Sequence, residues 1–201
     1  MEHINWKFTN KFRSHWIKVK FYREKPEVEE VKISKGIRFC EAVKKAITKP
    51  ILLDRNSLSC LGAQYAFGWS SDRKKLLEKC QNKTEAPMAN LKSTLSQIPR
   101  FKKPFRCIGL NTEGIPDVVI SYTSPQEIMN ITRLYQKYTG KNLDISLSNM
   151  MSICGGVAVK SYLEEKVTFS FGCVDARNFA GLERHSVAVG IPRNLCNIFV
   201  D

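Results

Sequence analysis

The chain has 201 residues, of which 43% are hydrophobic and 25% charged, so its composition is that of a globular protein and excludes a disordered chain. No apolar run reaches the ~18 residues of a membrane span. The charged first 16 residues also lack the apolar core of a signal peptide, so we expect a soluble cytoplasmic protein without a membrane partner.

The net charge of +13 is distributed unevenly. The basic excess is +7 over residues 1–55, +7 over residues 56–106 and −1 over residues 107–201. Such a surface could bind nucleic acid, an acidic protein or a small anionic ligand. No helix-turn-helix, zinc-finger or RNP-type motif accompanies the charge, so nucleic acid is the least favoured partner.

The first predicted element is a strand. Residues 16–22, WIKVKFY, alternate apolar and polar side chains, which predicts a half-buried strand. Residues 37–47 place apolar side chains three and four apart and predict a helix, which Pro50 ends. Residues 57–69 predict a second short helix, which begins near Ser57 and breaks at Gly68.

The middle of the chain is polar, basic and interrupted by prolines. Residues 81–106 therefore predict a linker or long loop. It divides the chain into a first half over residues 1–80, which includes the basic N-terminus, and a second half over residues 107–201.

The second half opens with an apolar run at 117–122, which predicts a strand buried on both faces. Ser124, Pro125 and Glu127 form a predicted capping box for a helix that stops at Gly140. The remaining predicted elements are a helix over about 149–163 and strands at 167–173 and 186–192.

Alternation of strands and helices predicts the α/β class. The surroundings of Cys60 and Cys154 also match, since both read Cys-x-Gly followed by an apolar helix, and a strand opens each half. We therefore expect two related α/β halves, a degenerate duplication, packed as one compact unit.

Four of the seven cysteines are candidate metal ligands. Cys40, Cys60 and Cys154 lie near predicted helix starts, and Cys173 ends a predicted strand. Thiolates from such positions could converge on one soft metal, and four of them complete either a [4Fe–4S] or a zinc site. The chain has no C-x₂-C pair, so the spacing does not choose between them.

Other residues near these cysteines are weighed as ligand-binding candidates. Arg177, four residues after Cys173, could hold an anionic ligand or face a cluster, or it could form a structural ion pair. Four glycines adjoin the cysteine motifs and belong to the same candidate set, namely Gly62, Gly155, Gly156 and Gly172. The remaining cysteines, Cys80, Cys107 and Cys196, lack this context and are assigned to packing or surface.

Taken together, the motifs resemble those of a prokaryotic family called domain of unknown function 169. They run in the order IRFCEAV (37–43), SCLGAQYAFGW (59–69), PDVVISYTSPQEIMNI (116–131), ICGGVAV (153–159) and SFGCVDAR (170–177). The resemblance covers about residues 16–195. It implies an α/β fold and an archaeal or anaerobic source, and it places the four candidate cysteines and Arg177 at typical family positions.

We therefore expect a cysteine-ligated metallocentre, an iron–sulfur cluster with zinc as the alternative metal, in redox or sulfur and cofactor metabolism. Two alternatives stay open, namely a binder of a small anionic or tetrapyrrole-like ligand without a cluster, and a thiol-based redox enzyme. Either a redox partner protein or a small anionic ligand fits these readings. The sequence offers no general base that would decide whether the protein is an enzyme. It also leaves open whether the protein forms a homodimer.

Overall fold

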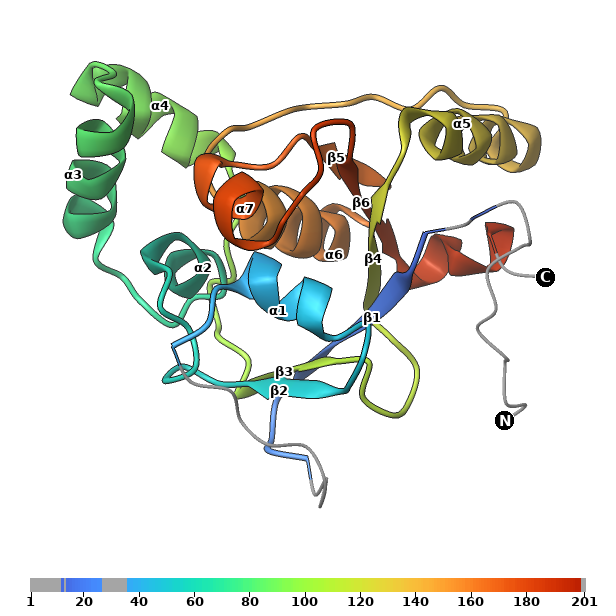
Figure 1. The fold of residues 1–201 in the computed structure, drawn as a ribbon, viewed down its shortest axis with the longest axis horizontal. Helices are drawn as coiled ribbons and strands as arrows, with labels where there is room; N and C mark the ends of the chain where they lie inside the picture. Colours follow the sequence, from blue (N-terminus) through green and yellow to red (C-terminus); the bar gives the residue numbers. More distant parts are fainter. Residues whose placement is uncertain (1–11, 13, 27–35, 200–201) are drawn as a thin grey trace.

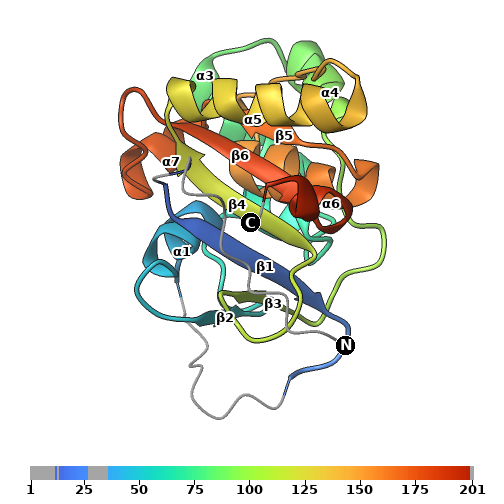
Figure 2. The ribbon, with the colours of Figure 1, turned by 90° about the vertical axis from the view of Figure 1, so that its right-hand side faces the viewer.

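The computed structural model describes residue 12, residues 14–26 and residues 36–199. Six strands form one sheet in the order β2-β3-β1-β4-β6-β5, and every neighbouring pair is antiparallel (Figures 1 and 2). The strand bounds are β1 Trp16–Tyr22, β2 Ile51–Leu53, β3 Cys107–Leu110, β4 Val118–Thr123, β5 Thr168–Ser170 and β6 Val187–Pro192. The predicted α/β class is confirmed.

The sheet separates two apolar cores because successive side chains of a strand point to opposite faces. In β4, Val118 and Ile120 belong to the larger core, whereas Val119 faces the smaller one. The strand is therefore buried on both faces, as its unbroken apolar run predicts. Its neighbour β6 is likewise buried along its whole length.

Most helices lie on the face of the larger core (Figure 1). They are α1 Phe39–Lys45, α2 Leu61–Ala66, α3 Arg73–Thr84, α4 Met88–Gln97, the π-helix η1 Ser152–Val159, α6 Lys160–Glu164 and α7 Val174–Phe179. On the other face, α5 (Pro125–Thr139) and the 3₁₀-helix η2 (Arg193–Ile198) contribute to the smaller core. Within the described residues, none of these helices combines the length and the apolar character needed to cross a membrane.

Helix α5 begins and ends as predicted. The Ser124 side chain accepts a hydrogen bond from the Glu127 backbone N–H, and the Glu127 carboxylate accepts one from the Ser124 N–H. Gly140 ends the helix with a left-handed φ of 66°. Glu127 also accepts hydrogen bonds from Ser14 and from Thr123, so this buried carboxylate joins the segment before β1 to the start of α5.

The prediction of a linker or long loop over residues 81–106 is wrong, because much of this segment is helical. The end of α3 and the whole of α4 occupy most of it, and the two helices form a hairpin (Figure 1). Leu76, Leu77, Leu91 and Leu95 bury the apolar stripes of the hairpin in the larger core. Within the expected linker, two leucines four residues apart, Leu91 and Leu95, thus outweigh a polar, proline-containing composition.

Strands from the two expected halves share the same sheet. Strand β1, from the first half, pairs with both β3 and β4 of the second. The chain is thus one α/β unit, and the predicted duplication is not shown by this topology.

Candidate metal centre

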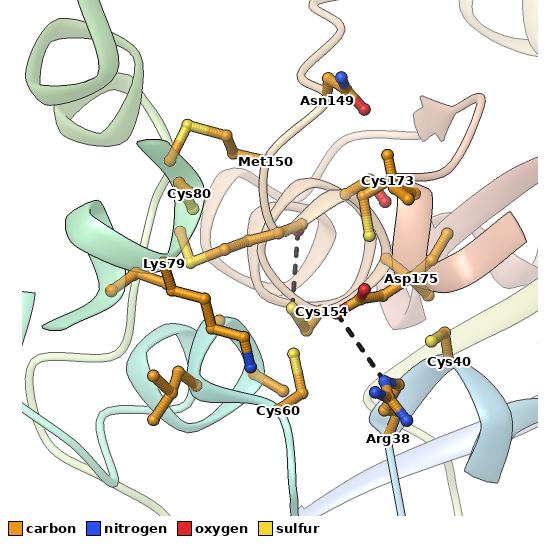
Figure 3. Close-up of a pocket in the computed structure, with 18 of the residues that line it drawn as sticks. Arg38, Cys40, Cys60, Lys79, Cys80, Asn149, Met150, Cys154, Cys173 and Asp175 are labelled. Carbon is orange, nitrogen blue, oxygen red and sulfur yellow. Dashed lines mark hydrogen bonds and ion pairs between the residues drawn. The ribbon is translucent and has the colours of Figure 1, made fainter. Parts of the chain in front are cut away.

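Four short helices bring the four candidate cysteines to one cavity. Cys40 lies in the first turn of α1, Cys60 immediately precedes α2, Cys154 is the third residue of η1, and Cys173 immediately precedes α7. All four line a cavity of about 110 Å³. Figure 3 shows their sulfur atoms directed into this space from different sides. Residues far apart in the sequence therefore share one site.

The cysteines differ in exposure. Cys40 and Cys154 are buried, whereas Cys60 and Cys173 are partly exposed, and all seven cysteines of the chain are free. Cys154 Sγ donates a hydrogen bond to the Met151 carbonyl at 3.6 Å. That carbonyl also accepts from the backbone N–H groups of Gly155 and Gly156, so it keeps two donors if Cys154 loses its proton.

Burial favours the protonated form of Cys40, Cys60 and Cys154. It is the main cause that raises the pKa of Cys40 to about 12, and the nearby Cys173 and Cys60 raise it further. Burial also raises the pKa of Cys60, whereas hydrogen bonds from the backbone N–H groups of Ala63 and Gly62 lower it. The fully buried Cys154 has its pKa raised well above its ordinary value, and the other three thiols add to the effect. A bound cation would remove this mutual repulsion between thiolates.

A fifth cysteine lines the same cavity. Cys80, on α3, is half-buried and projects into the view of Figure 3 from the left. Its pKa is raised mainly by burial, which the neighbouring Lys83 opposes. Cys80 was assigned to packing or surface because no glycine marks its surroundings in the sequence. Cys107 and Cys196 are buried away from this cavity.

The rim of the cavity is cationic. Arg38, Lys79 and Lys83 line it together with a single described carboxylate, Asp175. Asp175 pairs with Lys83 and lies 3.8 Å from Arg38 Nε. The Arg38 guanidinium also lies over the Phe179 ring, 3.5 Å from its centroid. This excess of positive charge suits an anionic occupant.

Arg177 is not part of the cavity wall. Its guanidinium donates to the backbone carbonyls of Glu183 and Ser186, so it holds the loop between α7 and β6. The side-chain ion pairs considered for it are not the contacts it makes. Arg38, two residues before Cys40, is the arginine at the cavity, and its place directly before α1 was the available signal.

The four candidate glycines have different roles. Gly62 lines the cavity, and a Cβ there would lie 3.1 Å from Met151 Cγ. Gly155 allows η1 to approach the end of α4, since a Cβ would lie 2.7 Å from a methyl carbon of Ile98. Gly172 has a left-handed φ of 84°, and Gly156 is open. Only Gly62 among the four meets the cavity directly.

The sulfur atoms are not gathered at ligation distance. Over the described residues, no group of three or more His, Cys, Asp or Glu side chains has an arrangement that could hold a metal ion. A cysteine sulfur can move among staggered rotamers while its backbone stays in place. Four thiols around one cavity fit a soft metal or a cluster by donor chemistry, and ligation requires their sulfur atoms to come closer together.

A match to a family model confirms the resemblance seen in the sequence. A family model with the description "Uncharacterised ArCR" matches residues 10–201. The chain belongs to this family, DUF169. Searches among curated proteins and among solved structures found no match. For this DUF169 member, the cavity geometry is therefore the main guide to function.

Proposed function

We propose that this DUF169 protein binds a thiolate-ligated metallocentre, an iron–sulfur cluster, in the cavity between α1, α2, η1 and α7. Cys40, Cys60, Cys154 and Cys173 would be its ligands. The observation that carries the proposal is that four cysteines from four separate elements line one cavity. Four thiolates are the usual ligand set of a [4Fe–4S] cluster, and zinc is the alternative metal.

The charges around the cavity support an anionic centre. Four thiolates around a cluster carry net negative charge. Among the described residues at the rim, the side chains of Arg38, Lys79 and Lys83 outnumber the one carboxylate, that of Asp175. When bound, the cluster would supply one-electron chemistry. The chain would contribute the thiolates, limit access of water and set the charge around the centre.

The thiol-based redox enzyme is less well supported. Such an enzyme needs a cysteine whose pKa is lowered, so that the thiolate is present at neutral pH. Burial instead raises the pKa of Cys40, Cys60, Cys80 and Cys154. These thiols react slowly unless a metal displaces their protons.

The size of the cavity argues against a large organic ligand. Its volume of about 110 Å³ is below the ~150 Å³ of an engineered protein cavity that holds one benzene molecule. A tetrapyrrole-like ligand is far larger than benzene. A compact inorganic core, or a small anion at the cationic rim, fits the space better.

The first experiment is anaerobic purification from a host that makes iron–sulfur clusters. Iron, zinc and acid-labile sulfide are counted, and the visible spectrum is recorded. Matching iron and sulfide with a brown colour would support the cluster. One zinc per chain without sulfide would support the alternative metal, a thiolate-ligated zinc ion. A folded, colourless, metal-free protein would overturn the proposal.

Cysteine variants then test the ligand set. Cys40→Ser, Cys60→Ser, Cys154→Ser and Cys173→Ser should each lose most of the iron. Cys80→Ser is the matched control, because Cys80 lines the same cavity but is not an assigned ligand. Loss of iron from the Cys80 variant together with retention in one of the four would assign a different set.

A further inference from the structure

The π-helix η1 forms one wall of the cysteine cavity. It runs over eight residues, Ser152–Val159, and it begins after Met151, whose φ of 47° is left-handed. π-Helical segments are rare in proteins, and those that occur often lie at functional sites. Ser152 and Cys154 both line the cavity from this helix. The unusual helix thus places a hydroxyl two residues from a candidate ligand.

The Ser152 hydroxyl has no partner in the described structure. Ser152 is 0% exposed, and its Oγ atom makes no hydrogen bond within the described residues. A buried polar group without a partner is destabilising, so such groups are rare in native proteins. An unpartnered hydroxyl on a residue that lines the cavity indicates that the bound occupant supplies an acceptor.

We propose that the Ser152 hydroxyl donates a hydrogen bond to a sulfur of the centre bound in this cavity. The inference rests on the proposed function. A protonated thiol is a weak acceptor, whereas a thiolate or a cluster sulfide carries negative charge and accepts strongly. The partner of Ser152 therefore exists only when the centre is bound, which accounts for its absence in the protonated protein.

The consequence is a positioning and tuning role for Ser152. Hydrogen bonds to the sulfurs of a cluster stabilise its more negative, reduced form and so raise its reduction potential. Ser152 does not ligate the metal in this proposal. Its removal should leave the metal content intact and lower the potential.

Ser161 provides a matched control. It is also a serine with 0% exposure, it lies on α6, which continues directly from η1, and it does not line the cavity. Its Oγ donates to the Lys166 carbonyl at 3.0 Å. Removing the hydroxyl of Ser161 breaks an existing hydrogen bond, whereas removing that of Ser152 breaks none in the metal-free protein.

The experiment compares Ser152→Ala and Ser161→Ala with the unmodified full chain in two states. For the metal-free protein, urea unfolding should show Ser152→Ala at least as stable as the unmodified protein and Ser161→Ala less stable. After anaerobic cluster reconstitution, both variants should hold the same iron and sulfide as the unmodified protein. The midpoint potential should shift to more negative values in Ser152→Ala alone. Ser152→Gly removes the same hydroxyl and serves as a second variant if the alanine protein does not fold.

The outcomes separate this inference from the proposed function. If the unmodified protein takes up no cluster, the proposed function fails and the inference falls with it. If the cluster forms but its potential is the same in Ser152→Ala, the inference is overturned while the proposed function stands. Destabilisation of metal-free Ser152→Ala to the same degree as Ser161→Ala would show that the hydroxyl already has a partner, which also overturns it.

Discussion

The reactivity of Cys40 in the metal-free protein tests the description of the cavity directly. Burial and neighbouring thiols raise its pKa from 9.0 to about 12. Only the thiolate reacts with an alkylating reagent. At pH 8, a thiol of pKa 9.0 is roughly 10% ionised, whereas one of pKa 12 is roughly 0.01% ionised. The difference corresponds to a reaction about 1000-fold slower, before any loss of access is counted.

The assay is pulsed labelling with iodoacetamide followed by mass spectrometry of the peptide that contains Cys40. The matched control is the same cysteine in the urea-unfolded chain, where its pKa returns to the ordinary range. Folded Cys40 should be labelled about 1000-fold more slowly than unfolded Cys40 at pH 8. A ratio below about 10 would refute the reasoning, because it would mean that burial does not keep the thiol protonated.

Three further predictions concern the stability of the fold. Gly155→Ala should destabilise the protein by about 1–3 kcal/mol in urea unfolding, because the new Cβ would lie 2.7 Å from a neighbouring methyl carbon. Gly156→Ala is its control, with the nearest atom at 4.0 Å, and should be neutral or stabilising; equal losses in the two would contradict the packing argument. Burial alone would raise the pKa of Glu127, but hydrogen bonds, first from Ser14, lower it from 4.5 to about 2. Its ionisation therefore adds up to about 3 kcal/mol of stability above pH 4.5, which is lost as the pH falls towards 2. The stability of Glu127→Gln should therefore fall less between pH 4.5 and pH 2 than that of the unmodified protein. If the free energies of unfolding of the two proteins change in parallel with pH, Glu127 does not contribute this stability. Trp69→Phe removes a buried hydrogen bond of 2.7 Å to a backbone carbonyl and should lower the free energy of unfolding by about 1–3 kcal/mol in urea. A loss below about 0.5 kcal/mol would mean that the carbonyl finds another donor.

Local sequence patterns correctly predicted the strand β1 and the helix α5. The alternation in WIKVKFY gave the strand β1, Trp16–Tyr22, and the capping box at Ser124 with Gly140 gave both ends of α5. Each signal acts within one or two turns or along one strand, where backbone preferences and side-chain caps decide the conformation. The α3–α4 hairpin was missed because its polar surface residues hid a stripe of buried leucines.

The candidate cysteines could be chosen from the sequence, but their meeting place could not. Glycine context and predicted helix starts singled out Cys40, Cys60, Cys154 and Cys173, and the tertiary structure places all four on one cavity. Cys80 and Arg38 join them through helix packing and not through sequence spacing. Arg177, chosen for its distance from Cys173, instead holds a loop through backbone carbonyls.

The amino-acid sequence by itself determined the family and the α/β class, because motifs, periodicity and caps are local features of the chain. The antiparallel strand order and the cationic rim arise only when distant segments pack together. The same holds for the burial that raises the thiol pKa values and for the unpartnered Ser152 hydroxyl. These properties depend on which surfaces exclude water together, and a linear pattern does not specify that.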